Sequence, residues 1–306
     1  MFDFLISFWN VVPVTFAQSL IISFVVMGIM IPFRILGFPD LTSEGAFPLG
    51  GCVAAVVLAA GFHPLLAMLM ALICGFAAGC TTAWIHLRFR INTLLAGILV
   101  LTMLYSINLR IMGRTNIALF NFDSLFKWIS PSMANMPTFK IVVVGVLVLL
   151  VFAAGWYFFL TERGITVRAA GAGPQMAEAQ GINVWTITLL GVGAGGALSA
   201  LGGSIMVQSQ GFADVNMGLG ILINGLAALI IGESVVGRSS TLRQLAAPVV
   251  GSAIYYQLIS LCLTIGLKPA DLKLATGLFV LLMLGLPQLR SGGRYRILPP
   301  QEKVKE

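Results

Sequence analysis

Charged residues are scarce in this sequence. Only 9% of its 306 residues are Asp, Glu, Lys or Arg, 58% are hydrophobic and the mean hydropathy is +0.98, whereas soluble globular chains carry about 25% charged residues. This composition excludes an ordinary soluble protein and indicates a chain that crosses a membrane several times, with its charges in the loops. The net charge of +7 does not predict nucleic-acid binding, because the Lys and Arg residues stand singly in loops or near the C-terminus.

The sequence also lacks the motifs of nucleotide-binding sites. No Gly-x-x-x-x-Gly-Lys-Ser/Thr phosphate loop is present, so we expect this chain to bind neither ATP nor its Mg²⁺. The glycines between Gly191 and Gly203 are only superficially similar to a dinucleotide fingerprint, since they lie inside an apolar span that no strand precedes. They predict close packing of helices instead.

Histidine and cysteine are few, with two His and four Cys residues. No Cys-x-x-Cys pair occurs, and neither His63 nor His86 has partners at the spacing of a metal site or a catalytic triad. We therefore predict no catalytic residue, no metal site and no cofactor bound by this chain. No pair of Asp, Glu, Lys or His lies in the middle of an apolar span, as an ion-coupled carrier usually requires. A self-contained secondary carrier or channel is disfavoured, and it is kept as the alternative.

Nine apolar stretches approach the length of about 20 residues that crosses a bilayer as a helix. We predict an all-α polytopic membrane protein, a single transmembrane domain over residues 1–306 with about nine spans and a range of eight to ten. Residues 1–13, which include Phe2, Phe4, Phe8 and Trp9, are expected to form an interfacial helix and not a signal peptide. The predicted spans are 14–33, 45–61, 64–86, 92–112, 139–160, 184–207, 218–236, 245–265 and 271–288.

The distribution of basic residues predicts the orientation. If the spans alternate, twelve of the eighteen Lys and Arg residues fall on the side of Arg88 and Arg90. Because cytoplasmic loops are enriched in Lys and Arg, that side is expected to be cytoplasmic. The N-terminus then lies outside, and residues 289–306 form a cytoplasmic tail.

The largest loop on the opposite side is 113–138. Its aromatic residues Phe120, Phe122, Phe126 and Trp128 suggest that part of it lies along the membrane interface. Two interpretations stay open: the loop receives an extracytoplasmic partner, or its aromatic residues anchor a connecting helix in an aromatic belt.

Two short stretches echo each other and predict an internal repeat. The spacing from Asp40 to Gly51 equals that from Asp214 to Gly225, and Ala-Ala follows in both copies. The expected orientation inverts the second copy, and inverted repeats place a substrate pathway at their interface. The alternative is a chance similarity between helices rich in small residues.

Candidate pathway residues come from the polar positions within or near the ends of the spans. In the first copy of the repeat, Asp40, Thr42 or Ser43 could cap the following helix, with Glu44 in its first turn. In the second copy, Asp214 or Asn216 could do the same. Half or more of the polar positions are expected to be simple interhelical hydrogen bonds. The candidate pathway residues are Thr42, Ser43, Glu44, Asn92, Thr93, Asn108 and Asn224.

The longest clearly polar segment runs from Glu162 to Asn183. Gly171-Ala172-Gly173 predicts a flexible lead, and Pro174 suits the first position of a helix. Gly181 can end that helix in the left-handed conformation. A helix over 174–180 would be about 10 Å long and too short to be stable alone. We therefore expect it to pack on a cytoplasmic partner through Met176, Ala177 and Gln180.

The same segment resembles the coupling loop of ABC importer permeases, in the branch that includes branched-chain amino acid and ribose permeases. The chain departs from the common pattern at Ala172 or Gly173, where Asn is frequent, and at Pro174. A further departure is the stretch Val235–Arg238, where glycines often occur. The residues that carry the resemblance are Arg168-Ala169-Ala170-Gly171, Ala177, Gly181-Ile182-Asn183, Gly195–Gly203, Gly225–Ser234, Phe38–Thr42 with Gly45-Ala46, and Asn92–Ile98.

The resemblance implies a type II ABC importer in the bacterial cytoplasmic (inner) membrane. Such an importer pairs the permease with a second copy or a related permease, with two ATPase subunits that bind ATP and Mg²⁺, and with an extracytoplasmic solute-binding protein. Residues 161–183 would be the cytoplasmic coupling loop. The stretches Leu41–Gly45 and Leu104–Arg114 look most like permeases for amino acids, either aromatic or branched-chain. The implied coupling residues are Arg168, Gly171, Pro174, Gln175, Met176, Ala177, Glu178, Gln180 and Gly181.

Overall fold

A computed structural model describes residues 2–265 and the single residues 271, 274, 277, 278 and 281. In this part of the chain, eight helices are long and apolar enough to cross a membrane, which agrees with the prediction of an all-α polytopic protein. The predicted span at 271–288 lies almost entirely outside the described residues, and so does the whole tail at 289–306. The spanning helices are α1 (Phe2–Met30, continued by the π-helix η1, Ile31–Ile35), α2 (Thr42–Ala59), α3 (Pro64–Phe89), α4 (Thr93–Met112), α6 (Pro137–Leu160), α9 (Val184–Gln210), α10 (Ile221–Val236, whose span begins with the short helix η2, Val215–Gly218) and α11 (Thr241–Thr264).

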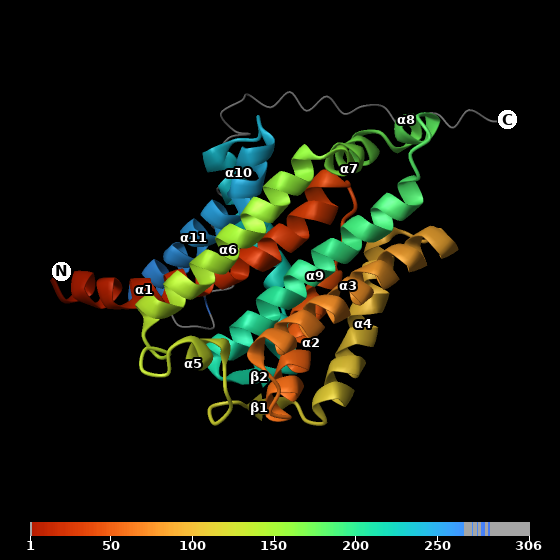
Figure 1. Cartoon of the computed structure of the whole chain (residues 1–306). Helices are drawn as coiled ribbons and strands as arrows, with labels where there is room; N and C mark the ends of the chain where they lie inside the picture. Colours follow the sequence, from red (N-terminus) through yellow and green to blue (C-terminus); the bar gives the residue numbers. More distant parts are fainter. Residues whose placement is uncertain (1, 266–270, 272–273, 275–276, 279–280, 282–306) are drawn as a thin grey trace.

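Residues 1–13 were predicted to form an interfacial helix, and the described part of this segment, residues 2–13, is continuous with the first spanning helix. Helix α1 begins at Phe2 and contains Pro13, and its apolar spanning part starts at Val11. Figure 1 shows that α1 changes direction near its N-terminal end. A proline inside a helix removes a backbone hydrogen bond and kinks the helix.

The spanning helices alternate in direction, and contacts between distant segments show which loops share an end of the bundle (Figure 1). The ends of α4 and α9 meet because strand β1 (Asn116–Ala118) pairs antiparallel with strand β2 (Phe212–Asp214). At the other end lie the short helices α7 (Glu162–Ala172) and α8 (Pro174–Ala179). We call these the β1–β2 end and the α7–α8 end. Of the basic residues that the structure describes, seven lie at the α7–α8 end and four at the β1–β2 end.

Helix α9 lies at the centre of the packing, between α1 and α3 in Figure 1. Its glycines bring helix backbones into direct contact. A Cβ atom on Gly203 would overlap the carbonyl oxygen of Phe47 in α2, and one on Gly196 would overlap that of Gly75 in α3. Gly195 meets Gly28 of α1 in the same way. The glycine run therefore packs helices, as predicted.

The two copies of the predicted repeat share a local backbone conformation. In each copy a glycine with positive φ stands three residues before the aspartate: Gly37 (φ 63°) before Asp40, and Gly211 (φ 79°) before Asp214. Each aspartate then accepts a hydrogen bond from the backbone N–H two residues further on, at 2.8 and 2.7 Å. The helices that follow, α2 and α10, run in opposite directions through the bundle (Figure 1). The two copies therefore share the conformation of the turn before the helix, in addition to their short sequence match.

Candidate functional site

Two helices occupy the segment that was predicted to be a flexible lead and one short helix. Gly171 lies inside α7, and a Cβ atom there would overlap the carbonyl oxygen of Ile35 in η1. The prediction of a flexible lead was wrong, because the packing of α7 against η1 holds this stretch in a helix. Gly173 alone separates α7 from α8.

Helix α8 itself forms where it was predicted. It begins at Pro174 and ends at Ala179, and Gly181 follows with a positive φ of 78°. Met176 is 74% exposed at the α7–α8 end of the molecule, whereas Ala177 is only 3% exposed. Ala177 is thus nearly covered by its own chain, and the exposed part of the predicted contact face consists of Met176 and Gln180, next to the exposed Gln175 and Glu178.

A shallow hollow of about 330 Å³ lies on α7 and α8. Small and apolar residues line most of it, and the exposed side chain of Met176 lies at its border. Figure 1 shows α7 and α8 projecting beyond the ends of α6 and α9. The lining residues are Ala169, Ala172, Gly173, Met176, Ala177, Gln180 and Ile182.

Arg168, predicted to be a coupling residue, is directed into the molecule. Its guanidinium donates to the carbonyl oxygen of Phe159 at 3.0 Å and to the hydroxyl of Thr241 at 2.8 Å. These bonds join α7 to the end of α6 and to the start of α11. Arg168 therefore holds the α7–α8 unit on the spanning helices.

The same end of the bundle contains an ionic cluster that the sequence did not predict. The carboxylate of Glu233, near the end of α10, lies 2.9 Å from Arg34 of η1 and 2.6 Å from Arg238. The Glu233 side chain is 5% exposed. A lone acid at the end of an apolar run was visible in the sequence, but its partner Arg34 is almost 200 residues away. The cluster ties the ends of α1 and α10 together beside α7.

The start of α2 holds a buried polar cluster. The Thr42 hydroxyl lies 2.6 Å from the hydroxyl of Thr82 in α3, and Asp40 accepts hydrogen bonds from the Thr42 N–H and hydroxyl. These hydrogen bonds fix Thr42, the first residue of α2. The N-cap position of α2 is Leu41. Thr42 and its neighbour Ser43 are fully buried. Two of the candidate pathway residues are therefore packed inside the chain.

Burial raises the pKa of the Asp40 carboxyl from 3.8 to about 6, although the hydrogen bonds from Thr42 act in the opposite direction. The folded protein therefore holds this proton more tightly than the unfolded chain. Stability is expected to fall as the pH rises from about 4 to about 6, by on the order of 3 kcal/mol.

Asp40→Asn is expected to remove this pH dependence, because the amide keeps the hydrogen-bond acceptor and does not ionise. The difference between the melting temperature of the detergent-purified variant and that of the wild type should become more positive as the pH rises from 4 to 7. Asp123→Asn, at an exposed carboxylate of the β1–β2 end, is the control and should follow the wild type. Parallel curves for the wild type and Asp40→Asn would contradict the prediction.

The remaining pathway candidates divide into two groups. Asn92 is the N-cap of α4, where its side chain accepts the N–H of Leu94 at 2.9 Å, and Thr93 begins that helix. Asn224 accepts a hydrogen bond from the hydroxyl of Tyr255 at 2.9 Å. Asn92 and Thr93 lie together at the start of α4, where the Thr93 hydroxyl donates to the Asn92 side-chain oxygen at 3.5 Å, and Asn224 lies apart from them on α10. Glu44 and Asn108, the last two candidates, line one small hollow between α2, α4 and the start of α10.

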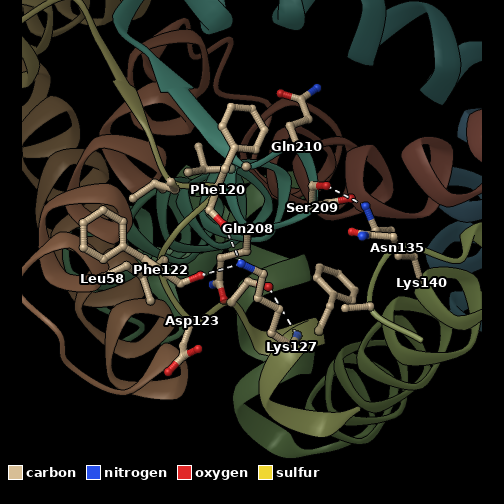
Figure 2. Close-up of a pocket in the computed structure, with 16 residues that line it drawn as sticks. Leu58, Phe120, Phe122, Asp123, Lys127, Asn135, Lys140, Gln208, Ser209 and Gln210 are labelled. Carbon is tan, nitrogen blue, oxygen red and sulfur yellow. Dashed lines mark hydrogen bonds between the residues drawn. The ribbon is translucent and has the colours of Figure 1, made fainter. Parts of the chain in front are cut away.

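The loop at the β1–β2 end encloses a larger hollow of about 380 Å³, shown in Figure 2. Its lysines are used to hold the loop. Lys127 donates to the carbonyl oxygens of Phe120 and Phe122, and Lys140 donates to that of Ser209 at 2.7 Å. Figure 2 shows that the Lys127 bonds lie within the loop, whereas the Lys140 bond joins the start of α6 to the end of α9.

Among the aromatic residues of this loop, Phe126 in α5 (Leu125–Ile129) is 1% exposed and anchors the loop on the bundle. Phe120 and Trp128 are 65% and 55% exposed. Trp128 also packs edge to face on His63, with ring centroids 4.7 Å apart. The loop is therefore held on the bundle and exposes aromatic rings. This geometry agrees with both interpretations of the loop, as a surface for an extracytoplasmic partner and as an aromatic anchor at the membrane interface.

The family model for the permease component of branched-chain amino acid transport systems matches residues 14–286. This chain belongs to that permease family. It is 40% identical, over 89% of its length and 90% of the relative's, to a tyrosine transport system permease protein of Clostridioides difficile. It is 26% identical to the ribose import permease protein of Escherichia coli, over 63% of this chain and 60% of the relative. No solved structure matches the chain.

The family match covers the structural features described above for this ABC permease. The matched region contains the α7–α8 unit, both copies of the repeat and the glycine core of α9. The two ends of the bundle carry different surfaces: a shallow hollow lined mostly by small and apolar residues at the α7–α8 end, and a loop with exposed aromatic rings at the β1–β2 end.

Proposed function

We propose that this chain is the membrane-spanning subunit of an ATP-driven importer that carries an amino acid, most directly an aromatic one such as tyrosine, across a bacterial cytoplasmic membrane. The observation that carries the substrate is the 40% identity to a permease named for tyrosine transport over nine-tenths of both chains. The ribose permease of Escherichia coli matches less of its sequence and at lower identity.

In this proposal the α7–α8 end faces the cytoplasm and the N-terminus lies outside. The excess of basic residues at the α7–α8 end supports this orientation. Helix α8 would insert into a groove of a separate ATPase subunit, which binds ATP and Mg²⁺. The bonds of Arg168 to α6 and α11 would carry the motion of α7 and α8 into the spanning helices.

The complete importer would contain two permease subunits, two ATPase subunits and a solute-binding protein. The solute-binding protein would meet the β1–β2 end, where the braced loop exposes Phe120 and Trp128. The permease performs no covalent chemistry. Its role is to open the path to one side of the membrane and then to the other.

Reconstitution of the chain with its ATPase and solute-binding protein in liposomes tests the proposal, with L-tyrosine as the probe. We expect tyrosine uptake that requires Mg²⁺-ATP and the ATPase subunit. A slowly hydrolysed ATP analogue should not support it. Uptake by this chain alone, driven by an ion gradient, would instead identify a self-contained carrier.

A further inference from the structure

Helix α10 begins inside the bundle and not at its surface. A Cβ atom on Gly45 would touch Leu101 and Leu104, at the middle of α4, so the adjacent Glu44 lies at the same depth. The Glu44 carboxylate accepts the backbone N–H of Gly220, the residue before α10, at 2.7 Å. The N-terminus of α10 therefore lies at mid-depth. Membrane transporters place substrate groups at such interrupted helices, where irregular backbone is tolerated only beside protein or a cavity. A helix N-terminus by itself favours an anion, and at α10 the Glu44 carboxylate already fills that role.

The short chain between β2 and α10 packs along α2. The 3₁₀-helix η2 (Val215–Gly218) follows β2, and a Cβ atom on Gly218 would overlap the carbonyl oxygen of Glu44. Asp214 caps η2 and not α10, so the predicted capping of α10 by Asp214 or Asn216 was wrong. The cap of α10 comes instead from Glu44, in the other copy of the repeat. The two copies are thus joined at this point by one carboxylate.

A hollow of about 30 Å³ lies beside this junction. It has room for one or two groups of the size of a water molecule. Asn108 lines it, is 1% exposed, and has a side-chain oxygen without a hydrogen-bond partner in the described part of the chain. The second carboxylate oxygen of Glu44 likewise has no hydrogen bond to any described residue. The lining residues are Glu44, Gly45, Pro48, Leu101, Tyr105, Asn108, Val215, Asn216, Gly218 and Leu219.

These groups select for a cation that donates hydrogen bonds. The carboxylate of Glu44 and the amide oxygen of Asn108 are acceptors, and no Lys or Arg lines the hollow. An anion would be repelled by Glu44, whereas a primary ammonium offers three donors. Tyr105 and Leu219, which are 47% and 66% exposed, border the hollow at the chain surface. The face of an aromatic ring also attracts ammonium groups.

We propose that Glu44 and Asn108 bind the ammonium group of the transported solute, at the start of α10. The proposal rests on the proposed function in taking the cation to be part of the cargo. Glu44 and Asn108 lie on α2 and α4, and only the tertiary structure brings them together. Glu44 also accepts the Gly220 N–H at the start of α10. An ammonium group bound in the hollow would therefore contact the same carboxylate that joins the two repeat copies.

Equilibrium binding to the full-length chain, purified in detergent without its ATPase, tests the assignment. The probes are L-tyrosine, tyramine, which keeps only the ammonium, and 3-(4-hydroxyphenyl)propionate, which keeps only the carboxylate. We expect both amines to bind and the propionate to bind about tenfold more weakly or not at all. Glu44→Gln keeps an acceptor for the Gly220 N–H and loses the charge, so the affinity for both amines should fall about tenfold or more.

Asn108→Leu, which removes the second acceptor at similar volume, should weaken amine binding in the same direction. Asp123→Asn is the matched control and should leave binding unchanged. Equal binding of the propionate and tyrosine, wild-type affinity in Glu44→Gln, or no amine binding to the wild type would each overturn the proposal. If Glu44→Gln is not monodisperse, Asn108→Leu and the probe series decide.

Different results would contradict the proposed function and the assignment of Glu44 and Asn108. Amine binding that depends on Glu44, together with uptake that does not need ATP, would leave the site standing and remove the importer. ATP-dependent tyrosine uptake that is unchanged in Glu44→Gln, with unchanged binding, would remove the site and leave the importer.

Discussion

Met176→Asp is expected to weaken binding of the ATPase subunit by about 30-fold or more and to abolish ATP-dependent uptake. Met176 is 74% exposed on α8 and borders the apolar hollow of α7 and α8. A large exposed apolar side chain beside such a hollow fits the role of a contact that an interface buries at its centre. Aspartate would place a charge there without a partner. The folded permease should be unaffected, because the Met176 side chain packs on little of its own chain.

Co-purification of the ATPase subunit with the detergent-solubilised permease measures the first effect, and uptake into liposomes measures the second. Met133→Asp is the matched control, since Met133 is 49% exposed in the loop at the β1–β2 end. That variant should retain the ATPase. If Met176→Asp also retains it, α8 is not the docking helix. Ala177 is unsuitable for this test, because a larger side chain at a position that is 3% exposed would disturb the fold of α8 itself.

Gly203→Ala is expected to destabilise the chain by about 1–3 kcal/mol or more. The added methyl group would overlap the backbone carbonyl of Phe47, which cannot move without shifting the whole of α2 relative to α9. Close approach of helix backbones through small residues is what holds membrane helices together. The loss should appear as a lower melting temperature and a smaller monodisperse fraction after solubilisation.

Gly145→Ala is the matched control, because it adds the same methyl group to a glycine of α6. The nearest atom, Cδ1 of Leu20, would lie 4.0 Å from that methyl group, which is an ordinary contact distance. Its melting temperature should equal or slightly exceed that of the wild type, since alanine favours the helix by about 1 kcal/mol over glycine. Equal losses in the two variants would mean that the glycines of α9 are replaceable and that the close α2–α9 contact is not required.

The features that the sequence predicted correctly depend on short stretches of chain. Eight described spans follow from runs of apolar residues, because a bilayer requires length and composition and little else. Helix α8 follows from Pro174 at its start and the left-handed Gly181 after its end. The glycine run of α9 predicted packing because only small residues let two backbones touch.

The tertiary structure decided where each polar side chain goes. Composition could not show that Ala177 is nearly covered by its own chain, that Gly171 is held in a helix by η1, or that β1 and β2 pair. The pairing of Arg34 with Glu233, and of Glu44 with the N–H of Gly220, joins residues more than 170 positions apart.

The local sequence determines one property of Glu44, and the tertiary structure determines another. Its place in the first turn of α2 follows from the local pattern, since helix starts favour carboxylates. Its role as the cap of α10 depends on the path that the intervening helices take through the bundle. A hydrogen bond acts only over about 3 Å, so the partner of a polar group is set by the packing of whole helices, which no local pattern records.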